Sequence, residues 1–162
     1  MRFSADPKII LSNPIHFLAF GFGSGLSPKA PGTMGTLVAL PLVYGLMHLS
    51  LLSYLCCVLM LSLLGVYLCG ESARRLNAHD HPGIVFDEFA GMAVTMIAVP
   101  LKFQWLLLGF LLFRLFDIWK PWPIREADHR LSGGVGIMLD DIIAGLFSCV
   151  LLHVAISISR FI

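Results

Sequence analysis

Charged residues are scarce in this sequence of 162 residues. Asp, Glu, Lys and Arg together make up 13% of it, whereas about 25% is usual in soluble domains. Because hydrophobic residues reach 57%, so few charges cannot form the polar shell of a soluble globule. The composition also excludes a disordered chain, a coiled coil and a secreted disulfide scaffold. The net charge of +1 provides no clustered basic surface for nucleic acid.

Cysteine occurs without the spacing of a metal site or of a disulfide framework. The four residues are Cys56, Cys57, Cys69 and Cys149, and all lie in apolar surroundings. We expect them to be free, buried thiols. The sequence begins MRFSADPKIILSNP, with charge and proline where a secretory signal needs an apolar core, so no cleavable targeting segment is expected. The length favours a single domain over residues 1–162.

Long apolar runs dominate the rest of the chain. No charged residue lies between Lys29 and Glu71, and 37–70 is apolar apart from a short break near Ser50. One helix over 37–70 would be about 51 Å long, which is well beyond a hydrocarbon core of about 30 Å. We therefore expect two helices joined near Ser50. The first is short and contains proline, so it is bent or only dips into the bilayer, and the second covers about 54–70.

Two further apolar segments follow. Residues 89–116 are interrupted by Pro100 and Lys102, so this segment is either one kinked span or a hairpin of two short helices. Residues 137–158 are long enough to span a bilayer, and we expect a glycine-rich loop over 132–136 to precede them.

The hairpin is the favoured alternative because it brings three polar segments to one face of the membrane. These segments, 1–36, 71–88 and 117–136, hold eight of the eleven Lys and Arg residues. The positive-inside rule makes that face cytoplasmic. The predicted fold is therefore an all-α, multi-pass integral membrane helical bundle, with short and re-entrant helices and polar loops on the cytoplasmic face.

A short internal repeat carries most of the acidic residues of interest. The string GIVFDEF at 83–89 matches GIMLDDI at 136–142, and we expect each copy to place two adjacent carboxylates at the start of an apolar helix. The four acids are Asp87, Glu88, Asp140 and Asp141. Helix capping explains one carboxylate near a helix N-terminus, whereas two repel each other unless a cation or an arginine is present. Capping, a proton or ion pathway and a divalent metal site all remain open, and the matched pairs favour metal ligation by oxygen, typical of Mg²⁺ or Mn²⁺.

A second cluster lies between residues 114 and 125. Arg114 and Asp117 are three residues apart, so on a helix they share a face and can form an ion pair. Alternatively, Asp117 joins the metal ligands, while Arg114, Lys120 and Arg125 bind a phosphate.

Two loops add candidate residues. The segment 21–36 contains five glycines and leads into a helix, so it either presents backbone N–H groups to an anion or serves as a turn or a re-entrant segment. It is not a Walker loop. The string His79-Asp80-His81 either supplies a proton donor to a leaving alkoxide or an extra ligand, or is a solvated loop. A cation site beside an anion site at a membrane surface favours phosphoryl chemistry on a lipid head group.

Four strings together carry a family resemblance. They are GFGSGLSPKAPGTMGT at 21–36, HDHPGIVFDEFAGM at 79–92, FRLFDIWKPWPI at 113–124 and GGVGIMLDDIIAG at 133–145. In this order they closely resemble the phosphatidylglycerophosphatase A family of Gram-negative bacteria, from about residue 12 to residue 151. The resemblance implies an all-helical, Mg²⁺-dependent lipid phosphatase of the bacterial inner membrane. It would convert phosphatidylglycerophosphate to phosphatidylglycerol and phosphate, with the bilayer as its other partner and no protein partner implied.

We therefore predict the following site. The metal ligands are Asp87, Glu88, Asp117, Asp140 and Asp141, the substrate-binding residues are Lys29, Thr33, Arg114, Lys120 and Arg125, and His79 joins the five acids as a catalytic residue. The sequence lacks the nucleophile motifs of phosphocysteine, phosphoaspartate and phosphohistidine enzymes, which leaves a metal-activated water. The alternatives are a small cation transporter or channel subunit and a structural membrane subunit. Acids beside basic loops favour the enzyme.

Overall fold

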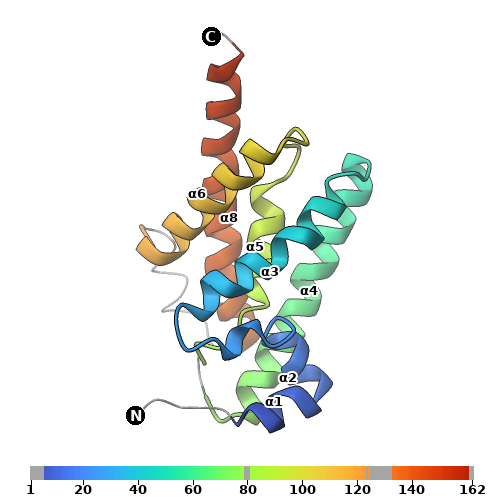
Figure 1. Cartoon of the computed structure of the whole chain (residues 1–162), viewed down its shortest axis with the longest axis vertical. Helices are drawn as coiled ribbons and strands as arrows, with labels where there is room; N and C mark the ends of the chain where they lie inside the picture. The colour runs from blue at the N-terminus through green and yellow to red at the C-terminus, as the bar shows by residue number, and fades with distance from the viewer. Residues whose placement is uncertain (1–5, 79–80, 123, 125–132, 161–162) are drawn as a thin grey trace.

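The computed structural model describes residues 6–78, 81–122, 124 and 133–160. Within these ranges the chain is helical and contains no strand (Figure 1), which confirms the all-α prediction. The helices are α1 (Pro7–Ser12), α2 (Pro14–Ala19), α3 (Pro31–Leu46), α4 (Leu51–Arg75), α5 (Asp87–Thr95), α6 (Phe103–Trp119) and α8 (Gly133–Ser159), with a short 3-10 helix η1 (Ser24–Leu26).

The predicted break near Ser50 is confirmed. Ser50 caps α4, and its hydroxyl accepts a hydrogen bond from the backbone N–H of Ser53 at 3.3 Å. α4 is longer than the sequence suggested because it continues through its charged end. There Glu71 pairs with Arg74 and Arg75 at the i+3 and i+4 positions, a spacing that supports the last turn of a helix.

The predicted hairpin over 89–116 is also confirmed. α5 and α6 are separate helices, and Pro100 and Lys102 lie in the connection between them. The connection is held against α8, because the carbonyl oxygen of Ile97 accepts hydrogen bonds from His153 Nε2 at 2.9 Å and from Cys149 Sγ at 3.8 Å. Arg114 near the end of α6 pairs with Glu88 in the first turn of α5, so the chain turns back, and the single kinked span is excluded.

The predicted glycine loop over 132–136 is wrong for the residues described. α8 begins at Gly133, and the glycines serve packing: a Cβ on Gly134 would overlap the backbone carbonyl of Val66 in α4. α4 and α8 therefore meet backbone to backbone. As a consequence Asp140 and Asp141 lie two turns inside α8, and the prediction that they start a helix is also wrong.

The prediction of buried thiols is correct for Cys69 only. All four cysteines are free, but Cys56 is exposed and Cys57 and Cys149 are half-buried. The reason is that α4, which carries Cys56 and Cys57, and α8, which carries Cys149, both turn apolar side chains outward instead of toward the core of the protein.

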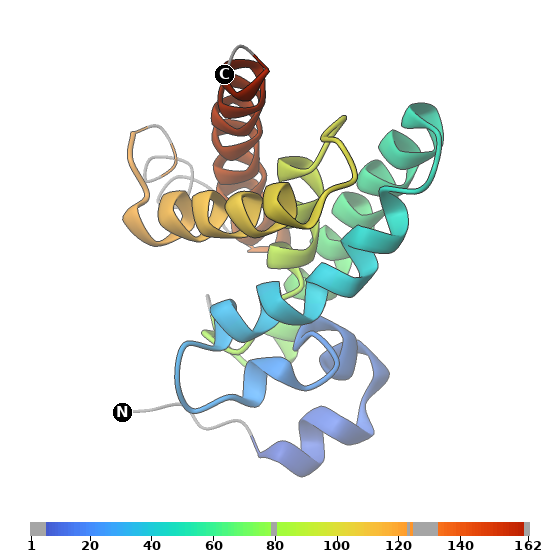
Figure 2. The same cartoon turned by 45° about the horizontal axis from the view of Figure 1, so that its top comes forward.

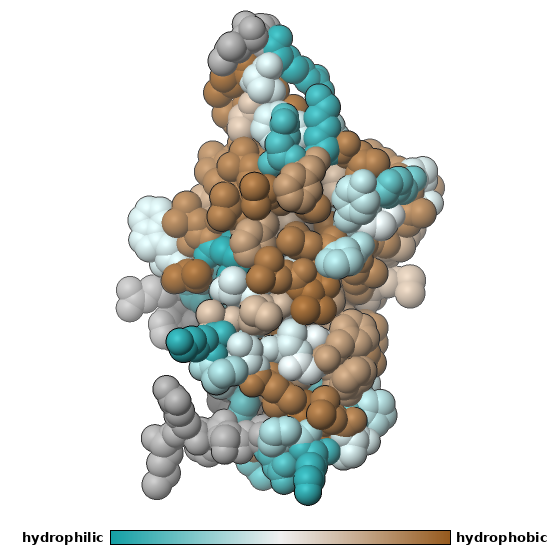
Figure 3. Space-filling model, viewed as in Figure 1, coloured by the Kyte–Doolittle hydropathy of each residue, from teal (hydrophilic) through white to brown (hydrophobic). Residues whose placement is uncertain are grey.

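Of the described helices, α4 and α8 are long and apolar enough to cross a membrane, by length and composition. Only 22% and 28% of their apolar windows are buried inside the protein. Leu52 on α4 is 74% exposed and Val150 on α8 is 63% exposed. Figure 3 shows apolar residues over the middle of the molecule, with hydrophilic residues gathered toward its two ends. Such faces suit lipid better than water.

α5 occupies the centre of the molecule. It packs against α3, α4, α6 and α8, as the two views in Figures 1 and 2 show. From Glu88 to Thr95 every residue of α5 is buried. The burial of this short helix places the acids of its first turn inside the protein.

We expect Gly134→Ala to lower the thermal unfolding midpoint of the protein in detergent. The added methyl group would separate α4 from α8, and overpacking of this kind costs about 1–3 kcal/mol. The matched control is Gly45→Ala in α3, where a Cβ has no heavy atom within 4 Å and alanine favours the helix. Equal midpoints for the two variants would contradict close packing at Gly134.

Candidate active site

The start of α5 is fixed by its contacts with the N-terminal part of the chain. The backbone N–H groups of Val85 and Phe86 both donate to the carbonyl oxygen of Ala19, at 2.9 and 3.1 Å. Gly25 lies directly against Gly83, since a Cβ on Gly25 would overlap the Gly83 carbonyl. These glycines therefore act in packing, and they orient the segment that leads into α5.

Carboxylates from three helices converge around the start of α5. Asp87 and Glu88 are in the first turn of α5, Asp117 is near the end of α6, and Asp140 and Asp141 are on α8. Asp117, Asp140 and Asp141 each offer a carboxylate oxygen, and these oxygens lie within 4.8 Å of one another. Oδ2 of Asp141 is buried and has no hydrogen-bond partner among the described residues. Buried polar atoms without a partner are rare in folded proteins, and a bound cation would satisfy this one.

The carboxylates also act on one another electrostatically. Burial raises the pKa of Asp87 well above its ordinary value, and the nearby carboxylates of Glu88, Asp140 and Asp117 raise it further. Burial and the Asp117 carboxylate raise the pKa of Glu88 to about 7, although Arg114 and Thr36 oppose this change. Both shifts reflect burial first and crowded negative charge second, and a bound cation would offset both.

Two basic side chains contact this cluster. Arg114 Nη1 lies 2.6 Å from Glu88 Oε2 and 2.5 Å from Asp117 Oδ2, so the predicted pairing of Arg114 with Asp117 is present. Lys120 Nζ lies 2.6 Å from Asp140 Oδ2. Arg114 links α6 to α5, and Lys120 links the end of α6 to α8. Among the described residues, five carboxylates therefore face these two cations.

Two residues of the site were not predicted from the sequence. The buried hydroxyl of Thr36 donates to Glu88 Oε2 at 2.8 Å. A Cβ on Gly32 would meet Glu88 Oε1 and the guanidinium of Arg114, so the start of α3 closes over this pair. Both residues lie in the predicted glycine-rich segment, but their spacing alone did not distinguish Thr36 from Thr33.

Of the other predicted substrate-binding residues, the structure describes Lys29 and Thr33. Lys29 is exposed ahead of α3, and Thr33 is half-buried in its first turn. Neither makes a hydrogen bond or an ion pair with the carboxylates within the described part of the chain. His79 and Arg125 lie outside the described residues. His81 is buried, and its Nδ1 accepts a hydrogen bond from the Gly83 N–H at 3.1 Å.

Comparison with known proteins gives consistent matches. The family model described as Phosphatidylglycerophosphatase A matches residues 17–156. The Phosphatidylglycerophosphatase A of Escherichia coli (strain K12) is 49% identical over 150 residues, covering 92% of this chain and 87% of the relative. The protein of the same name from Haemophilus influenzae is 47% identical, covering 88% and 89% of the two chains.

A more distant relative carries another substrate name. The Putative phosphatidylinositol-3-phosphatase of Bacteroides thetaiotaomicron is 37% identical over 146 residues, covering 83% of this chain and 89% of the relative. No solved structure matches. The family match covers most of the sequence, including all five acids and both cations of the site, and the chain belongs to the phosphatidylglycerophosphatase A family.

Proposed function

We propose that this chain hydrolyses the phosphomonoester of phosphatidylglycerophosphate and releases phosphatidylglycerol and inorganic phosphate. Its family and the names of its relatives from E. coli and H. influenzae support this activity. The observation that carries the chemistry is the convergence of Asp117, Asp140 and Asp141, with ligand oxygens within 4.8 Å of one another. The comparisons give no support to a cation transporter or channel subunit.

The donor set fits Mg²⁺. Every candidate ligand is a carboxylate oxygen, which is the ligand that this hard cation prefers, and Asp141 offers a buried oxygen that lacks a hydrogen bond within the described residues. Asp87 lies near enough to Asp117 and Asp140 for their charges to act on it. Glu88 has one oxygen engaged by both Thr36 and Arg114, which leaves Oε1 for a ligand role. When bound, Mg²⁺ supplies Lewis-acid stabilisation of the negative charge on the phosphoryl oxygens.

The basic residues would bind the phosphate. Arg114 offers a planar fork of N–H donors and Lys120 a point charge, and both already lie beside the carboxylates. Lys29, ahead of α3, and Thr33, in its first turn, would also contact the head group, as would Arg125, which lies outside the described residues. A carboxylate of the cluster accepts the proton of the attacking water, and His79 would donate a proton to the leaving glycerol oxygen.

The membrane arrangement follows from the same layout. We propose that α4 and α8 cross the bacterial inner membrane and that α3, α5 and α6 enter it as short or re-entrant helices. The acids would then lie at the lipid boundary on the cytoplasmic side, where the Lys and Arg residues are concentrated. The phosphate would reach the site from this boundary while the acyl chains stay in the bilayer.

We expect Asp140→Asn and Asp87→Asn each to lower the rate of phosphate release by about 100-fold or more, the scale seen when one preorganised electrostatic group is removed. The assay uses purified protein in detergent with phosphatidylglycerophosphate and Mg²⁺. Glu71→Gln is the matched control, because Glu71 pairs with Arg74 and Arg75 away from the cluster. Normal turnover in both aspartate variants would remove the metal assignment and leave family membership intact.

Removal of the metal should stop the reaction. With EDTA in the same assay, phosphate release should fall to the background rate, and excess Mg²⁺ should restore it. Equal rates with EDTA and with Mg²⁺ would overturn the proposed mechanism.

Thr36 should matter for turnover through its hydroxyl group. Thr36→Val keeps the shape of the side chain but removes the donor to Glu88, so the Glu88–Arg114 pair loses its alignment. A hydrogen bond to a charged group is worth about 1.5–3 kcal/mol, and we expect a fall in kcat of about tenfold. Thr36→Ser retains the donor and should stay near wild type. If the valine and serine variants have the same kcat, Thr36 has no such role.

A further inference from the structure

An apolar groove lies between α6 and α8. Its volume is about 330 Å³, and it is lined by Phe116 of α6 and by Leu146, Phe147, Val150 and Leu151 of α8. Every one of these side chains is apolar, and neither the metal site nor the phosphate contacts described above use them. A groove of this size falls in the range of small-molecule sites, about 300–1,000 Å³.

The groove continues directly from the carboxylate site. On α8, Asp140 and Phe147 are seven residues apart, so they share a face at a separation of roughly 10.5 Å along the helix. On α6, Phe116 immediately precedes Asp117. The rings of Phe116 and Phe147 are in contact, with their centroids 5.8 Å apart. The same two helices, which lie against each other in Figure 1, are joined by the ion pair of Lys120 with Asp140. The charged site and the groove therefore follow one another along the contact between α6 and α8.

The groove opens to the side of the molecule. Leu146 is 50% exposed and Leu151 is 44% exposed, and both are on a helix that is long and apolar enough to cross a membrane. This opening faces the region where lipid tails would lie in the proposed arrangement.

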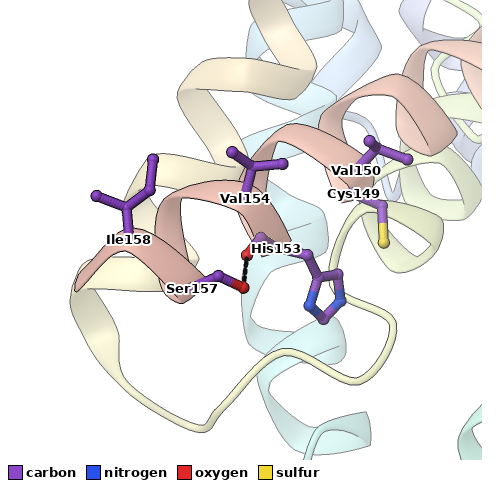
Figure 4. A pocket seen from close by; sticks show the side chains of 6 residues that line it. All are labelled: Cys149, Val150, His153, Val154, Ser157 and Ile158. Atoms are coloured by element: carbon purple, nitrogen blue, oxygen red, sulfur yellow. Dashed lines mark hydrogen bonds between the residues drawn. The ribbon is translucent and has the colours of Figure 1, made fainter. Parts of the chain in front are cut away.

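A second groove adjoins the first along α8. It has a volume of about 480 Å³, and Val150 lines both grooves (Figure 4). Among its polar lining residues, His153 Nε2 and Cys149 Sγ contact the carbonyl oxygen of Ile97, and the hydroxyl of Ser157 donates to the carbonyl oxygen of His153. With these groups satisfied, Val154 and Ile158 extend an apolar path toward the C-terminal end of α8.

We propose that the groove between α6 and α8 binds one acyl chain of the lipid substrate. This inference rests on the proposed function, because it requires a phospholipid phosphate at the carboxylates. Lipid tails are as apolar as leucine side chains, so a chain that stays at the depth of the bilayer gains little hydrophobic free energy by exchanging neighbouring lipid for the groove. The role of the groove is therefore to orient the substrate. An acyl chain held along α8 fixes the depth and direction at which the phosphate meets the carboxylates. Misplacement of a reacting group by about 1 Å can lower a rate by about 100-fold.

The test fills the groove and compares two substrates. Leu151→Trp and Val150→Trp each place a large ring in it, and Leu64→Trp on α4 is the matched control, since Leu64 is 46% exposed and lines neither groove. For each protein in detergent with Mg²⁺, kcat/KM is measured with dioleoyl and with dihexanoyl phosphatidylglycerophosphate. The six-carbon chains contact less of the groove than the oleoyl chains do, so turnover of the short-chain substrate should depend less on it. The readout is the ratio of the two values, which does not depend on the fraction of protein that folds.

We expect the long-chain to short-chain ratio to fall about tenfold in both groove variants and to stay at the wild-type value in Leu64→Trp. An unchanged ratio in both groove variants, or an equal fall in the control, would overturn the acyl-chain site while wild-type turnover upholds the proposed function. An unchanged ratio with an altered oligomeric state of Leu151→Trp would assign the groove to a second copy of the chain. Absence of phosphate release from either substrate by the wild type would instead reject the proposed function, and the acyl-chain site with it.

Discussion

The crowding of five carboxylates at one end of the helical bundle is the constraint on which the rest of the structure depends. Burial, together with repulsion between the carboxylates, raises the pKa values of Asp87 and Glu88 above their ordinary range. The fold offsets this cost with an arginine shared between Glu88 and Asp117 and a lysine paired with Asp140. The remaining excess of negative charge is what makes the site suited to a divalent cation.

Close backbone packing holds those charges in place. Gly25 against Gly83 fixes the approach to α5, and Gly134 against Val66 brings α8 onto α4. A side chain at Gly25 or at Gly134 would push apart the elements that carry the acids. α5 is buried from Glu88 onward, so its first turn cannot move independently of the helices around it. The acids therefore lie on packed helices and not on an exposed loop. Such a rigid, preorganised site is the usual requirement for electrostatic stabilisation of a transition state.

The position of the site also explains why such an apolar protein carries it. Hydrolysis of a lipid phosphomonoester needs a polar centre for the head group and an apolar surface for the chains, and the two must be in fixed relation. The contact between α6 and α8 provides both within a few helical turns: the Lys120–Asp140 ion pair at one level and the ring contact of Phe116 with Phe147 at the next. Charge and apolar surface therefore follow one another along the same helix pair.

The sequence by itself determined the helical class, the break at Ser50, the hairpin formed by α5 and α6, and the four paired acids with Asp117. These features follow from local causes: apolar length, the positions of proline and lysine, and repeated residue strings. Only the tertiary structure decided that α8 begins at Gly133, that Cys56 is exposed, and that Thr36 rather than Thr33 donates to Glu88. Each of these depends on which neighbour a residue meets across the fold. Glycine predicts a turn when read along the chain, yet against a facing backbone it permits two helices to touch, and that distinction exists only in three dimensions.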